Sequence, residues 1–172
     1  QLRPITLRQT FAYVPQRNHA FSGSIFDNIA LADPTASLKQ VKEACHMAGL
    51  LNTIESLPSG FDTAFREGLE AHVPQGFLRQ MALARAFLRD APVLIMDEPA
   101  SGLDEKDEQI FMETLQQLRG TRTILMITQR PSHMRACDRV LMLEAGQIKA
   151  FGPPDEVLGS PRPQNPKVMP AE

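Results

Sequence analysis

The sequence predicts an α/β fold with a largely buried sheet. Two observations support this: short apolar runs typical of buried strands, and amphipathic stretches with helical spacing that alternate with them. The alternation is clearest in the centre and the C-terminal half, and it favours a sheet packed against helices. A length of 172 residues suits one domain that can bury a sizeable core.

The first half of the chain contains one predicted strand and three predicted helices. FAYV (11–14) is a short apolar run that Pro15 ends. Ser24 is suited to cap a short amphipathic helix over 24–31. The next helix, over 37–49, ends at Gly49, and another runs from Phe77 to about residue 90.

The second half is richer in strands. VLIM (93–96) is followed by a helix over 105–120, which has an acidic first turn and a terminal glycine, as the helix dipole favours. Three further strands are expected at 122–128, 139–143 and 147–152. The proline-rich end, 160–172, has almost nothing to bury and is expected to be a disordered tail.

Composition excludes several classes of protein. A net charge of −2 gives no general attraction to nucleic acid or anionic lipid. Cys45 and Cys137 form no CxxC motif and fit free thiols in a reducing compartment better than a zinc site. The sequence contains no apolar run of the length that spans a bilayer, and the first residues lack the apolar core of a signal peptide. The four histidines show no metal-ligand spacing and are expected to be solvated.

The stretch VLIMDEP (93–99) carries the strongest chemical signal. Four apolar residues lead directly into Asp97 and Glu98, an arrangement suited to holding Mg²⁺ and aiming a water in a nucleotide hydrolase. The alternative is a buried strand whose loop happens to carry two solvated acids. The neighbouring stretches ALARAFLRDAP, SGLD (101–104) and TQR (128–130) favour the functional interpretation.

These motifs, with FAYVPQRNHAFSGSIFDNIAL upstream, resemble the nucleotide-binding domain of ATP-binding cassette (ABC) proteins, most closely those of exporters. VLIMDEP resembles the Walker B motif, SGLD the D-loop, and Gln16 stands at the glutamine of the Q-loop. The resemblance implies a P-loop NTPase-like ABC ATPase domain over 1–159. Its helical subdomain would span about 23–90 and its core sheet segment about 91–158.

The resemblance also implies roles for individual residues around ATP and Mg²⁺. Asp97 would hold Mg²⁺, and Glu98 would orient and deprotonate the attacking water. Gln16 would place an amide oxygen near the metal, although a Gln after Pro15 taken alone is a turn residue. Asp104 would lie at the seam of a head-to-tail dimer.

Three departures from the family pattern qualify these roles. No GxxxxGK[ST] phosphate-binding loop occurs in the 172 residues, so we expect the C-terminal part of a cassette, incomplete at its N-terminus and inactive alone. Pro74, Gln75 and Gly76 stand in the signature loop that contacts nucleotide, and Pro74 lacks both a hydroxyl and an N–H donor. Phe77, which ends this loop, could equally be core. Gln129 replaces the catalytic switch histidine and cannot carry its charge.

The implied function is that of an ATP-binding and hydrolysing domain that powers an exporter. Its partners would be a second nucleotide-binding domain and a transmembrane domain, at the cytoplasmic face of the inner or plasma membrane. The alternative is a non-catalytic module that completes or regulates a competent partner. A DNA-repair type of cassette is disfavoured because no basic stripe is present. Without N-terminal strands, we expect one face or edge of the core to be partly uncovered, with Leu94, Met96 and Ile127 more exposed than in a complete cassette.

Overall fold

The computed structural model describes residues 10–65 and 73–159, and these form two compact units. One unit extends to Ile127 and the other begins at Thr128. The expected disordered tail, 160–172, and His72 lie outside the described residues.

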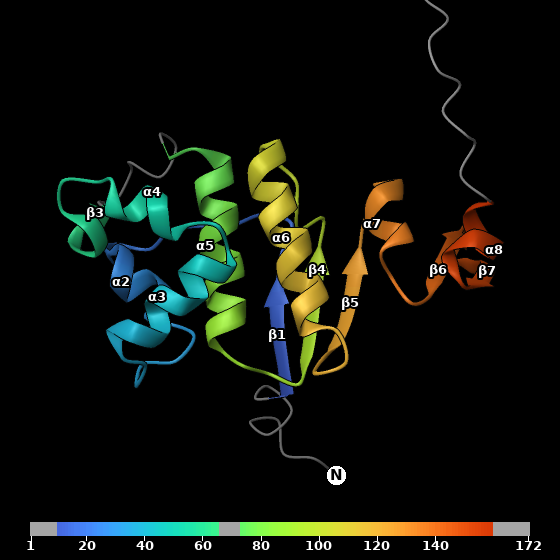
Figure 1. The fold of residues 1–172 in the computed structure, drawn as a ribbon, viewed down its shortest axis with the longest axis horizontal. Coiled ribbons are helices and arrows are strands. Elements are labelled where there is room, and N and C mark those ends of the chain that lie inside the picture. Colours follow the sequence, from blue (N-terminus) through green and yellow to red (C-terminus); the bar gives the residue numbers. More distant parts are fainter. Residues whose placement is uncertain (1–9, 66–72, 160–172) are drawn as a thin grey trace, which may run out of the picture. The chain divides into compact units, whose positions relative to one another are not determined.

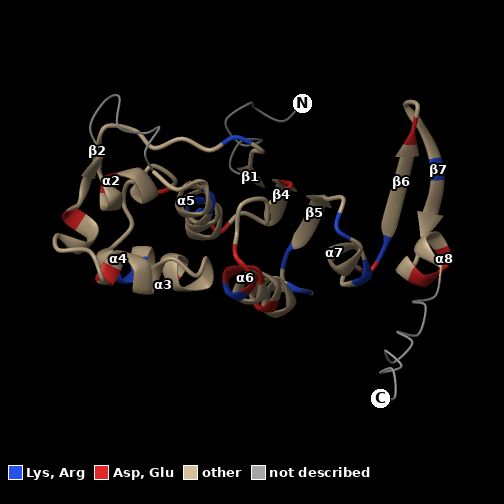
Figure 2. Cartoon of the chain, turned by 90° about the horizontal axis from the view of Figure 1, so that it is seen from above, with Lys and Arg blue, Asp and Glu red and all other residues tan. Residues whose placement is uncertain are grey.

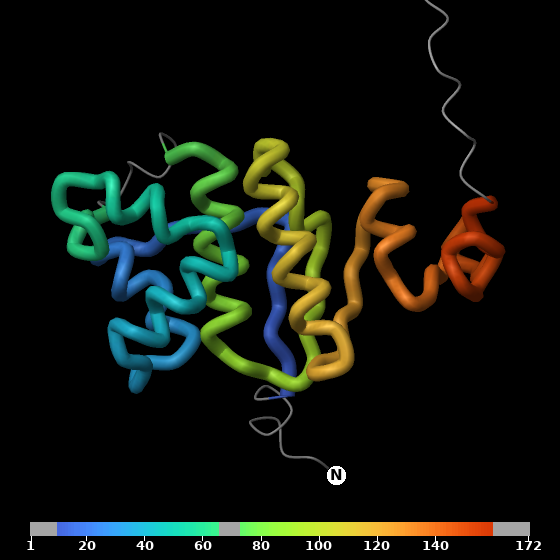
Figure 3. The backbone as a smooth tube through the Cα atoms, viewed as in Figure 1, coloured from blue at the N-terminus to red at the C-terminus, as the bar shows by residue number. Residues whose placement is uncertain are grey.

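The first unit is built on a parallel sheet of three strands, in the order β1 (Phe11–Val14), β4 (Val93–Asp97) and β5 (Thr123–Ile127). β1 and β4 lie side by side in Figures 1 and 3, although a large helical segment separates them in the sequence. In the register, Val14 lies opposite Met96, and Asp97 lies opposite Ile127. The carboxyl ends of all three strands therefore meet at one edge of the sheet.

Two long helices, α5 (Gln75–Leu88) and α6 (Glu105–Leu118), belong to the same unit as this sheet. α5 is buried on nearly all sides, as expected of a helix inside a core rather than on its surface. The hydrophobic core joins strand residues to helix residues, among them Val14, Leu94, Met81 and Phe111.

The sheet is buried on one face only. Leu94 and Met96 are fully buried, so the expectation that they would be exposed is wrong: successive strand residues point to opposite faces, and these two point into the core. The opposite face carries Tyr13, Leu125 and Ile127, which are 57%, 56% and 55% exposed. Ile127 is therefore exposed, as expected. The prediction of a largely buried sheet is confirmed for one face only.

Shorter elements complete the first unit. They are the paired strands β2 (Gly23–Ser24) and β3 (Ala64–Phe65), the helices α2 (Ile25–Ala30), α3 (Leu38–Met47) and α4 (Leu51–Glu55), and the 3₁₀ turn η1 (Gly60–Asp62).

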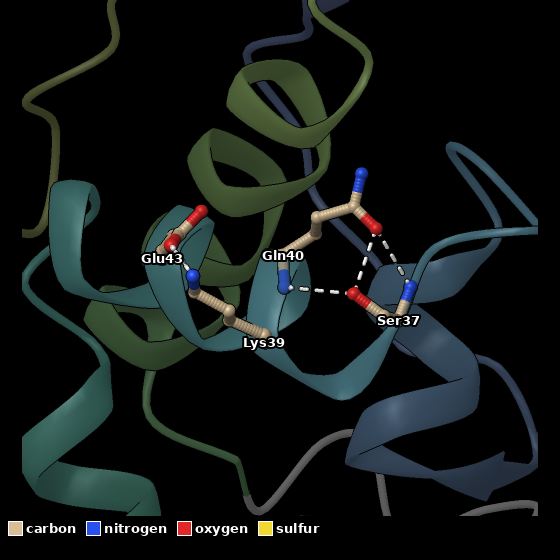
Figure 4. A network of polar contacts seen from close by, with 4 residues as sticks. All are labelled: Ser37, Lys39, Gln40 and Glu43. Atoms are coloured by element: carbon tan, nitrogen blue, oxygen red, sulfur yellow. Dashed lines mark hydrogen bonds and ion pairs between the residues drawn. The ribbon is translucent and has the colours of Figure 1, made fainter.

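Side-chain caps begin two of these helices. Ser24 caps α2 as predicted, and its hydroxyl accepts from Asp27 N at 3.0 Å. Ser37 and Gln40 form the same reciprocal cap at α3, beside the Lys39–Glu43 pair (Figure 4).

The second unit consists of α7 (Pro131–Arg135), the antiparallel hairpin β6 (Val140–Glu144) and β7 (Gln147–Gly152), and α8 (Pro154–Leu158). Arg135 and Asp155 form an ion pair at 3.3 Å between α7 and α8. His133 in α7 is 1% exposed, so the prediction of a solvated side chain is wrong for this histidine. Its burial follows from the packing of α7 inside this unit, which histidine spacing does not reveal.

Candidate functional site

Gln16, Asp97 and Glu98 lie at the same edge of the sheet. Asp97 is the last residue of β4 and Glu98 follows it, while Gln16 is two residues beyond the end of β1. Because β1 and β4 are parallel neighbours, the structure brings the segment that holds Gln16 to the same edge as the two acids. Both acids are partly exposed and Gln16 is exposed, so all three are accessible to a ligand in this unit.

Glu98 has a left-handed backbone conformation, with φ of 45°. This region costs a residue with a side chain about 1–2 kcal/mol. Two hydrogen bonds hold the conformation: Glu98 N donates to Ile127 O at 2.9 Å, and Ser101 N donates to Glu98 O at 3.0 Å. Such conformations often occur at active sites, where the surrounding structure fixes the direction of a side chain.

Arg79 of α5 lies beneath this edge and was not predicted from the sequence. It is 4% exposed, and its guanidinium donates to three main-chain oxygens: Pro15 O at 2.8 Å, Gln16 O at 2.7 Å and Ser101 O at 3.3 Å. Burial lowers the pKa of Arg79, while the negative charges of Asp97 and Glu98 act in the opposite direction. The available signal was a basic residue next to the apolar run of this helix.

Arg85, one and a half turns further along α5, holds the segment that follows Gln16. Its Nε donates to Asn28 O at 2.7 Å, its Nη2 to Asn28 Oδ1 at 2.9 Å and its Nη1 to His19 O at 2.9 Å. The guanidinium also lies 5.5 Å from the centre of the Phe21 ring. The sequence did not indicate these contacts of Arg85, which hold both ends of the segment from His19 to Asn28.

Asp104 serves as the N-cap of α6 in this structure. Its Oδ1 accepts from Asp107 N at 2.8 Å. Acidic side chains gather at the start of α6 (Figure 2), where the helix dipole favours them. Burial raises the pKa of the Asp107 carboxyl, and the charge of Asp104 adds to this effect.

The start of α5 lies against the loop that carries Asp104. Pro74 is the N-cap of α5 and forms no side-chain cap, and Gln75 is exposed. A Cβ added to Gly76 would lie 2.7 Å from Gly102 O, so only glycine allows this close approach. Phe77 packs on Phe65 with ring centres 6.3 Å apart, which supports the interpretation of Phe77 as part of the core.

Gln129 belongs to the second unit. It lies between β5 and α7, is exposed, and is next to Thr128, whose Oγ1 accepts from Arg130 N at 3.1 Å. Asp97 and Glu98 belong to the first unit, so the predicted role of Gln129 beside them stays a prediction.

The donor set at the sheet edge fits Mg²⁺ bound together with phosphate. Asp97, Glu98 and Gln16 offer oxygen atoms, which this hard cation prefers. Among residues 10–65 and 73–159, no three His, Cys, Asp or Glu side chains are grouped to hold an ion on their own. Mg²⁺ typically takes one or two carboxylates and completes its shell with water and substrate phosphates, so a site of this kind needs no larger protein cluster.

No family model matches the chain. It is 34% identical over 143 residues to a probable ABC transporter ATP-binding/permease protein of Haemophilus influenzae, covering 83% of this chain and 26% of the relative. It is 36% identical over 157 residues to the glutathione/L-cysteine transport system ATP-binding/permease protein CydC of Escherichia coli, covering 91% and 27%. An ATP-dependent lipid A-core flippase of Desulfotalea psychrophila is 35% identical over 153 residues, covering 89% and 27%. The chain thus spans about a quarter of these relatives.

The fold also matches that of a solved ABC exporter structure. The structure of a bacterial Atm1-family ABC exporter with ATP bound matches with a TM-score of 0.85 and 30% identity, over 90% of this chain and 27% of that one. Within the part of the chain that the structure describes, no helix has both the length and the apolar character to cross a membrane.

Proposed function

We propose that the chain is the part of an ATP-binding domain that carries its catalytic residues, and that this domain powers export. The chain is a homologue of ABC transporter ATP-binding/permease proteins and shares the fold of an ABC exporter. The observation that carries the proposal is the position of Asp97, Glu98 and the segment holding Gln16 at one edge of a parallel sheet. In open α/β sheets, ligands bind at the carboxyl ends of the strands.

Each residue at the edge has a chemical role in this proposal. Asp97, with the amide oxygen of Gln16, would hold Mg²⁺, which neutralises charge on the phosphates when bound. Glu98 would accept a proton from the water that attacks the terminal phosphate. The strained backbone of Glu98, fixed by its bonds to Ile127 and Ser101, would keep the carboxylate aimed at that water.

The start of α5 would contact a second nucleotide across a head-to-tail dimer. Gln75 and Gly76 present main-chain N–H groups at the N-terminus of a 14-residue helix, which favours anions. Pro74 contributes no N–H donor, so this contact would be weaker than one made by a polar residue. Asp104 would lie near the same seam, and Gln129 would donate to the terminal phosphate without carrying a charge.

The partners in this proposal are a second nucleotide-binding domain and the transmembrane domain of an exporter. The domain would act at the cytoplasmic face of the inner or plasma membrane. The phosphate cradle would come from a segment with the GxxxxGK[ST] motif, which the 172 residues do not contain.

Magnesium-dependent ATP binding tests the proposal. These 172 residues are joined to a strand–loop–helix segment that carries GxxxxGK[ST], and ATP binding is measured by equilibrium dialysis with and without Mg²⁺. We expect Asp97→Asn to lose the enhancement by Mg²⁺, while Asp62→Asn, a change to an acid in the η1 turn, keeps it. An unchanged Mg²⁺ effect in Asp97→Asn would contradict the proposed metal ligand.

A second candidate is a non-catalytic module that completes or regulates a competent partner. Pro74 and Gln129, which replace a polar loop residue and a histidine of the family pattern, favour it. Turnover of the Gln129→His variant in the same assembly separates the two. A rise in turnover supports a slow ATPase, and no turnover in either form supports the pairing module.

A further inference from the structure

Arg79 connects two loops that are far apart in the sequence. The first is the Gln16 loop, residues 15–18, and the second is the aspartate loop, residues 98–104. One guanidinium donates to Pro15 O and Gln16 O in the first loop and to Ser101 O in the second. All three acceptors are main-chain oxygens, so these bonds fix the path of each loop rather than one side chain.

A second contact attaches the aspartate loop to the same helix. Gly76, one turn before Arg79 in α5, lies so close to Gly102 O that an added Cβ would come within 2.7 Å of it. Gly102 itself has φ of 82°, a conformation that favours glycine. Neighbouring turns of α5 therefore hold the aspartate loop at Ser101 and at Gly102. A shift of this loop would displace Ser101 O, which accepts a hydrogen bond from Arg79.

Arg85 shows that this connection is specific to Arg79. Both arginines project from α5, and each donates three hydrogen bonds. The hydrogen bonds of Arg85 go to His19 and Asn28, within one segment. Arg79 bonds to two loops instead.

We propose that Arg79 is a positioning residue that couples the Gln16 loop to the aspartate loop, so that a displacement of one is transmitted to the other. This inference rests on the proposed function for its consequence: the metal ligand Gln16 and the water-activating Glu98 would adjust together. The guanidinium suits this task because it is planar, keeps its charge and offers five donors in a fixed geometry. A connected hydrogen-bond network of this kind is a physical route for coupling between sites.

A double-mutant cycle on the 172-residue chain without nucleotide tests the coupling. Gly102→Ala strains the aspartate loop, because alanine disfavours φ of 82°. Amide ¹H–¹⁵N shifts of Gln16, Arg17 and Asn18 are then compared in four proteins: wild type, Gly102→Ala, Arg79→Gln and the double variant. We expect Gly102→Ala to shift these amides in the wild-type background and to leave them unchanged in the Arg79→Gln background.

Arg85→Gln is the matched control, and in its background Gly102→Ala should still shift the Gln16 loop. If Arg79→Gln does not fold, Arg79→Lys takes its place, because an ammonium lacks the fork that reaches both loops and should reduce the shift. A shift of equal size with and without Arg79, or no shift in any background, overturns the proposal. None of these signals requires nucleotide, so failure of the proposed ATPase function would leave them unchanged.

Discussion

Cys45 is a fully buried thiol in α3, and burial raises its pKa from 9.0 to about 12. The folded state therefore favours the protonated thiol more than the unfolded state does. The resulting stability is fully present below about pH 9 and is lost as pH rises toward 12. We expect the free energy of unfolding, measured by urea titration, to fall between about pH 9 and pH 10.5. In Cys45→Ala this part of the pH dependence of stability should disappear. The same pH dependence in both proteins would contradict a raised pKa of Cys45.

The site residues differ in how far the sequence revealed them. Asp97, Glu98 and Gln16 were predicted because a motif fixes their order, and parallel strands place their segments at one edge. Arg79 was missed because its three acceptors are main-chain oxygens, which have no sequence signature. The left-handed backbone of Glu98 was missed for a related reason: the motif specifies a carboxylate and not its φ.

At the scale of elements, the close contact of α5 with the aspartate loop depends on Gly76. Replacing a helical glycine by alanine ordinarily stabilises a helix by about 0.5–1 kcal/mol. In Gly76→Ala the new methyl group would lie 2.7 Å from Gly102 O. We expect a net loss of about 1–3 kcal/mol, as for other overpacked sites, measured by thermal or urea unfolding. Gln75→Ala, at the exposed neighbouring position, should change stability little. A Gly76→Ala protein as stable as the wild type would show that the contact with the aspartate loop is loose.

The strands of the core sheet and the long helices followed from the sequence, whereas several short helices and the two-residue strands did not. β1 was predicted with its observed bounds, and the strand and helix bounds of β4, α3 and α6 lie within about two residues of prediction. The elements that were missed, β2, β3, α4, η1, α7 and α8, have two to five residues. Such segments are too short to show a hydrophobic period, and contacts with the rest of the unit decide their conformation.

At the scale of the whole molecule, the open face of the sheet is the feature with the largest consequence. Tyr13 of β1 and Leu125 and Ile127 of β5 expose apolar surface on this face, and β1 and β5 are the two edge strands of the sheet among the described residues. Exposed apolar patches and open edges favour association. We expect the chain to self-associate at high concentration in sedimentation velocity, and the double variant Leu125→Thr, Ile127→Thr to be more monomeric.

Threonine is chosen because its β-branched side chain favours the strand conformation while it removes apolar surface. Leu38→Thr is the control, because Leu38 is 50% exposed but lies in α3, outside the sheet. It should associate like the wild type. A wild-type chain that stays monomeric and unfolds cooperatively at high concentration would contradict this prediction.

The central claim is that the carboxylate of Glu98 activates the water that attacks ATP. The most direct test is ATP turnover by Glu98→Gln in the assembly joined to a GxxxxGK[ST] segment, with ATP binding measured in parallel. Glutamine keeps the size of the side chain and the backbone bonds to Ile127 and Ser101, but it cannot accept the proton. We predict that turnover falls by about 10²–10⁴-fold while ATP binding is retained. Turnover equal to that of the wild type would contradict the claim and favour the non-catalytic module.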